Sequence, residues 1–66
     1  MNYLLRALCL KLEGEIEVAK ANVMVYQRGS VGIGEHPDIV EAIETQISKI
    51  AEAEDKLETI KRHFKN

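Results

Sequence analysis

Residues 29–37 read Gly29-Ser30-Val31-Gly32-Ile33-Gly34-Glu35-His36-Pro37, and they hold three of the four glycines and the only proline of the chain. Gly and Pro are the strongest local signals that a regular element ends. On each side of this segment lies a stretch of about 26 residues with apolar side chains at helical spacing. The sequence therefore predicts an all-α helical hairpin within a single domain, 1–66. Its first helix covers about residues 2–28, a Gly-rich loop covers 29–36, and the second helix covers about 37–64.

The second stretch has the more regular pattern. Apolar residues recur in alternating steps of four and three, which is a heptad seam with one polar member. The seam consists of Ile39, Ile43, Gln46, Ile50, Ala53, Leu57, Ile60 and Phe64. Gln46 has two interpretations. Its amide either reaches water at the edge of the seam or is buried and pairs across a twofold axis, where it would fix the register.

The first stretch carries more apolar residues than one helix contact requires. One row follows the helical period, and a second row lies beside it, formed by Leu4, Val18, Ala21 and Val25. An apolar face this wide covers more than one neighbour, so the second row predicts contact with another chain. Gly14 lies in the middle of the stretch and predicts a bend or a close approach. The segment Val23-Met24-Val25-Tyr26 also suits a strand, although no other segment offers a convincing partner.

The small size of the chain predicts association. A hairpin of 66 residues sits near zero stability alone, and its single cysteine excludes an internal disulfide. We expect two hairpins to form a four-helix bundle by homodimerisation, with a tetramer as the alternative. The predicted interface consists of Leu5, Leu8, Leu12, Ile16, Val23, Ile43, Gln46, Ile50, Leu57, Ile60 and Phe64. In layout this is similar to the Rop class of dimeric RNA-binding hairpins, although the loop is longer here and no motif matches.

The composition narrows the class of protein. Apolar residues make up 45% of the chain and charged residues 30%, which argues against a disordered polymer and a membrane span. Arg6 interrupts the apolar start and Lys11 closes it, so we do not expect a signal peptide. The single cysteine, Cys9, suits a reducing compartment. The expectation is a cytoplasmic protein without membrane contact.

Catalytic and ligand motifs are weak. Glu41-x-x-Glu44 and Glu52-x-x-Asp55 loosely resemble the paired acidic motifs of the MazG-like pyrophosphohydrolases, and this resemblance implies magnesium-dependent hydrolysis of nucleotides. Both pairs lie on one helix, where the heptad places them on the solvated side. No Cys and His residues have zinc-site spacing. We therefore expect no catalytic residue, no metal and no cofactor.

Charge suggests the remaining candidate surface. Closing the hairpin brings residues 1–12 beside 54–66, and this open end carries six basic and three acidic side chains. A docking site for an acidic partner would consist of Arg6, Lys61, Arg62 and Lys65. The main prediction is an interaction or assembly module that pairs with itself or with an unidentified protein. The alternatives are a binder of nucleic acid or of an acidic partner, and the metal-dependent hydrolase. Nucleic acid is the weaker partner because the net charge is −2.

Overall fold

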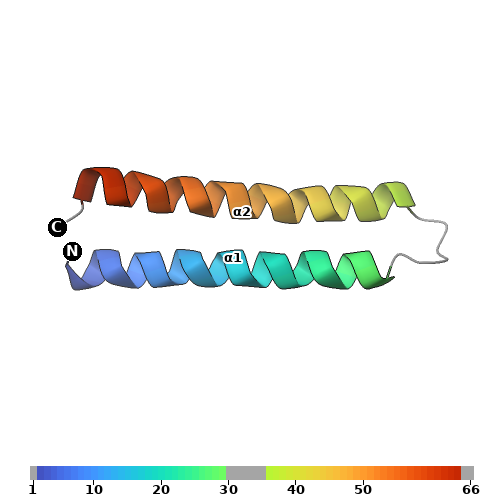
Figure 1. The fold of residues 1–66 in the computed structure, drawn as a ribbon, viewed down its shortest axis with the longest axis horizontal. Coiled ribbons are helices and arrows are strands. Elements are labelled where there is room, and N and C mark those ends of the chain that lie inside the picture. The colour runs from blue at the N-terminus through green and yellow to red at the C-terminus, as the bar shows by residue number, and fades with distance from the viewer. Residues whose placement is uncertain (1, 30–35, 65–66) are drawn as a thin grey trace.

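The computed structural model consists of two long helices, and it describes residues 2–29 and 36–64. α1 spans Tyr3–Gly29 and α2 spans His36–Phe64. The helices run antiparallel side by side, so the start of α1 and the end of α2 lie at the same end of the molecule (Figure 1). The molecule is a rod with extents of 50 × 15 × 11 Å. The structure thus confirms the all-α helical hairpin. The Gly-rich segment 30–35 lies outside the described residues.

The start of α1 is fixed by a side-chain cap. Asn2 Oδ1 accepts a hydrogen bond of 2.8 Å from the backbone N–H of Leu5. Asn is among the preferred residues at this position because its side chain satisfies a backbone N–H that has no partner within the helix. The cap by Asn2 therefore explains why α1 starts at Tyr3.

The interior of α1 is continuous. Gly14 lies within an uninterrupted helix, and a Cβ built on it would meet nothing within 4 Å, so α2 does not approach it closely. The segment from Val23 to Tyr26 is helical, which rules out the strand alternative. Glycine commonly follows the end of a helix and caps it in the left-handed region, and the position of Gly29 in the breaker segment would suggest this role. Gly29 is instead the last residue of α1, and its φ lies outside that region.

The core runs along the contact between the two helices. Leu12, Ala53 and Ile60 are buried and form its centre, and four half-buried side chains pack against them: Leu5, Cys9, Ile16 and Leu57. Ala19 is also buried, nearer the loop end of α1. Each helix contributes one stripe of its surface to this core, which is the most that a pair of helices can bury.

Within residues 2–29 and 36–64, neither helix combines the length and the hydropathy of a membrane-spanning segment.

Candidate functional site

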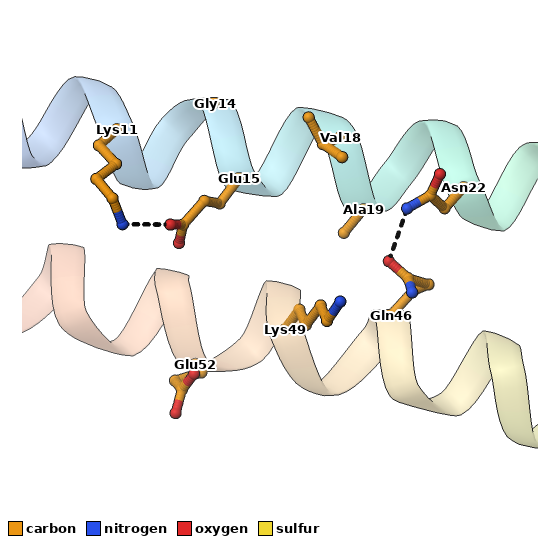
Figure 2. Close-up of a pocket in the computed structure, with 9 residues that line it drawn as sticks. All are labelled: Lys11, Gly14, Glu15, Val18, Ala19, Asn22, Gln46, Lys49 and Glu52. Atoms are coloured by element: carbon orange, nitrogen blue, oxygen red, sulfur yellow. Dashed lines mark hydrogen bonds and ion pairs between the residues drawn. The ribbon is translucent and has the colours of Figure 1, made fainter.

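A groove of about 610 Å³ lies between α1 and α2 near the middle of the hairpin (Figure 2). Its lining residues come from both helices and are Lys11, Gly14, Glu15, Val18, Ala19, Asn22, Gln46, Lys49 and Glu52. The ammonium of Lys11 donates a hydrogen bond to the carboxylate of Glu15, which lowers the pKa of Glu15 below its ordinary value. In the described part of the chain, no three His, Cys, Asp or Glu side chains form a group that could hold a metal ion. The groove therefore lacks the features of a metal centre.

A pair of amides lines this groove. Asn22 Nδ2 donates a hydrogen bond of 3.1 Å to Gln46 Oε1, and Gln46 is only 7% exposed (Figure 2). The partner of the buried amide is thus a residue of the same chain. Sequence reasoning missed Asn22, which lies on α1 directly before the apolar row member Val23. A half-buried polar pair of this kind favours the one alignment of the two helices in which both amides are satisfied.

The residues predicted for an oligomer interface lie mainly between the two helices of one chain. Buried or half-buried there are Leu5, Leu12, Ile16, Val23, Ile43, Gln46, Ile50, Leu57 and Ile60. Leu8 and Phe64 are exposed. The structure therefore gives most of this set a role in closing the hairpin, and their contact with a second chain stays a prediction.

A second set of apolar side chains remains exposed on α1. Residues 3, 7, 10, 14, 18, 21 and 25 follow steps of four and three, so they lie on one line along the helix. We call this line the outer face of α1, and it consists of Tyr3, Ala7, Leu10, Gly14, Val18, Ala21 and Val25. Its four large members are 83%, 60%, 62% and 66% exposed, in chain order. Two residues apart on a helix point about 200° apart, so exposed Gly14 and Ala21 lie opposite buried Leu12 and Ala19.

The corresponding side of α2 is polar. The residues opposite its seam are exposed and consist of Glu41, Ser48, Glu52, Asp55, Thr59 and Arg62. The large exposed apolar residues of α2 are Val40 and Ile47, on one flank, and Phe64, at the helix end. The apolar seam of α2 is therefore turned toward α1, and the side opposite the seam is polar.

The predicted docking residues gather at the open end of the rod. Arg6 lies near the start of α1, Lys61 and Arg62 lie near the end of α2, and all three are exposed. Lys65 lies outside the described residues. The rings of His63 and Phe64 meet edge to face at this end, with centroids 6.3 Å apart. Three of the four predicted basic residues therefore lie at the same end of the rod, and their contact with an acidic partner stays a prediction.

The candidate catalytic groups are dispersed. The carboxylates of Glu41, Glu44, Glu52 and Asp55 are exposed along α2. Cys9 is half-buried and packs against the core. These positions give neither a cluster of facing carboxylates nor an exposed thiol.

Comparison of the chain with protein-family models gives no match, and comparison with the curated proteins and with the solved structures gives no significant match.

Proposed function

We propose that this protein is a small assembly module that associates with a second copy of itself to bring four helices together. The observation that carries the proposal is the outer face of α1. Closing the hairpin buries one stripe of α1, and Leu10, Val18 and Val25 remain more than half exposed on its other side. A helix that is apolar on two sides is stabilised by two neighbours, and residues 2–29 and 36–64 supply α1 with only one.

The size of the core supports the same proposal. Four apolar side chains of the described residues are buried: Leu12, Ala19, Ala53 and Ile60. Conformational entropy costs about 1.5 kcal/mol per ordered residue, so a hairpin of this size gains more from burying a further face than a larger domain would. The four-helix assembly predicted from the sequence is a dimer that provides this burial. A lone cysteine that contributes to the core suits a cytoplasmic location for the assembly.

Solution mass tests the proposal. Light scattering over about 1 to 200 µM protein, with reductant present, should show a concentration-dependent rise from one chain to two, and the circular dichroism of the helices should rise with it. A helical monomer of constant mass over this range would contradict self-association. The outer face would then be a surface without a role in homodimerisation.

A further inference from the structure

The open end of the rod carries cations and no carboxylates. Residues 2–8 of α1 and 59–64 of α2 lie together at this end (Figure 1). These residues contain no Asp or Glu, and they include the exposed cations Arg6, Lys61 and Arg62. In the described part of the chain, none of these three cations forms an ion pair. Their charges are therefore available to an anionic partner.

The loop end of the rod has the opposite charge. The first turns of α2 carry Asp38, Glu41 and Glu44 there, and the last turn of α1 carries Arg28. An anionic partner is attracted by the open end and repelled by the loop end. The charge of the rod therefore selects the end at which such a partner binds.

Apolar side chains project from the same open end. Tyr3 and Leu4 begin α1 and Phe64 ends α2, and these side chains are 83%, 77% and 52% exposed. We call these three residues the apolar tip. The three cations lie two or three residues further from the end of the rod, which is about 3 to 5 Å along the helix axes. The open end thus consists of an apolar tip with a ring of positive charge directly behind it.

An anionic phospholipid bilayer presents the matching layers. Its charged headgroups lie at the surface, and its hydrocarbon lies directly beneath them. A rod that arrives end-on places its apolar tip beneath the phosphates while its cations stay level with them. Aromatic side chains are enriched at this interface, and each Lys or Arg near an anionic surface strengthens attachment. A single-stranded nucleic acid matches the cations and the aromatic rings but offers no counterpart to Leu4.

We infer that the open end of the rod docks on an anionic phospholipid bilayer, with the apolar tip below the phosphate groups and Arg6, Lys61 and Arg62 among them. This contact goes beyond the proposed self-association and, apart from Tyr3, uses residues that lie outside the outer face of α1. The expectation of no membrane contact rested on the lack of a spanning segment, and docking by the end of a rod requires none.

Binding of the protein to lipid vesicles tests this inference. The probes are vesicles of phosphatidylcholine alone and vesicles in which about 30% of the lipid is phosphatidylserine, whose headgroup makes the surface negative. Cosedimentation should give a partition coefficient at least about tenfold higher for the anionic vesicles. This difference should shrink as added salt screens the charges.

The double variant Lys61→Gln with Arg62→Gln tests the cations. The loss of two cations near the surface should lower the partition coefficient for anionic vesicles about thirtyfold. The control is Arg28→Gln with Lys49→Gln, which changes the net charge equally but lies away from the open end. We expect this control to lower the partition coefficient less than about threefold.

The double variant Leu4→Ser with Phe64→Ser tests the apolar tip, and Tyr3 is kept because it also belongs to the outer face of α1. Less apolar surface then enters the bilayer, so the partition coefficient should fall about tenfold. The control is Val40→Ser with Ile47→Ser, two side chains of α2 that are 62% and 51% exposed and lie away from the open end. This control should change the partition coefficient less than about twofold. Circular dichroism checks that every variant keeps its helices.

The outcomes separate this inference from the proposed self-association. Equal partitioning onto both kinds of vesicle, or none onto either, would overturn bilayer docking whatever the solution mass of the protein. Binding that depends on the cations but not on the apolar tip would show a site for polyanions in general, and would also overturn it. A monomer that binds anionic vesicles through both groups of residues would contradict the self-association alone.

Discussion

The two helices of this hairpin differ most on the sides that they turn away from each other. The outer side of α2 carries exposed polar residues such as Glu41, Ser48 and Asp55, whereas the outer face of α1 is a line of apolar and small residues. A hairpin needs only one apolar stripe on each helix, and α2 has that composition. The second stripe of α1 is therefore an addition that the fold of a single chain does not explain. It is the feature on which the proposed function in assembly rests.

The largest effect on dimerisation is expected from one of two matched substitutions, one on each helix. Val18 on the outer face of α1 and Val40 on α2 are the same residue type and are both 62% exposed. In the proposed dimer, the outer face of α1 contacts the second copy, so Val18→Glu places a carboxylate in this contact once in each copy. Lost burial and desolvation should weaken dimerisation by about 3 kcal/mol, or more than a hundredfold.

Val40→Glu is the control and should leave the dissociation constant within about twofold, because Val40 lies away from the outer face of α1. Sedimentation equilibrium measures both variants. If both variants weakened dimerisation equally, the outer face of α1 would be no more important for the dimer than the exposed side of α2.

The inner contact between the helices offers a second, smaller test. Gln46 is buried and accepts a hydrogen bond from Asn22, so either Asn22→Leu or Gln46→Leu leaves one amide without its partner. Each single variant should lose about 1 kcal/mol in free energy of unfolding. The double variant should recover that loss or exceed the stability of the unchanged protein, because two apolar side chains then replace the pair.

Urea denaturation at one fixed protein concentration measures this double-mutant cycle. Dimerisation should persist in all three variants, since the amides lie between the helices of one chain and not on the outer face of α1. Additive losses in the double variant would contradict the coupling, and loss of the dimer would return Gln46 to the role of a contact between chains.

The sequence predicted the helices closely, for physical reasons that the structure makes clear. The observed bounds of α1 and α2 lie within one residue of the predicted ones, because Gly29 and Pro37 limit the segment where helical periodicity stops. The partner of Gln46 could not be predicted in the same way. Periodicity orients each helix about its own axis, but the alignment of one helix along the other depends on side-chain packing, and this alignment brings Asn22 opposite Gln46.

The interface was harder to predict than the fold. A row such as Leu5, Leu12 and Ile16 has the same pattern whether it packs against the same chain or another one. In the structure these residues are buried or half-buried between α1 and α2, and their contact with a second chain stays a prediction. The second row, which includes Val18 and Val25, was visible in the sequence, but that α2 leaves these side chains exposed became clear only once α2 was placed.

The smallest expected effect concerns Gly14, where one substitution should stabilise the single hairpin and weaken the dimer. Gln is a better helix former than Gly by about 0.6 kcal/mol, and the space around position 14 within the chain is open. Gly14→Gln should therefore raise the helicity and stability of the single hairpin, measured by circular dichroism at a concentration where the mass is that of one chain.

The same substitution should weaken the dimer, because it adds a side chain to the outer face of α1 in each copy, where the proposed contact with the second copy lies. Glu13→Gln, on the adjacent residue but away from the outer face, is the control and should change neither quantity by more than about 0.5 kcal/mol. A variant at Gly14 that gained stability and dimerised more tightly would show that the glycine serves no contact between copies. Opposite changes in helicity and association would show that α1 accepts a less stable helix in order to keep its outer face open to a second copy.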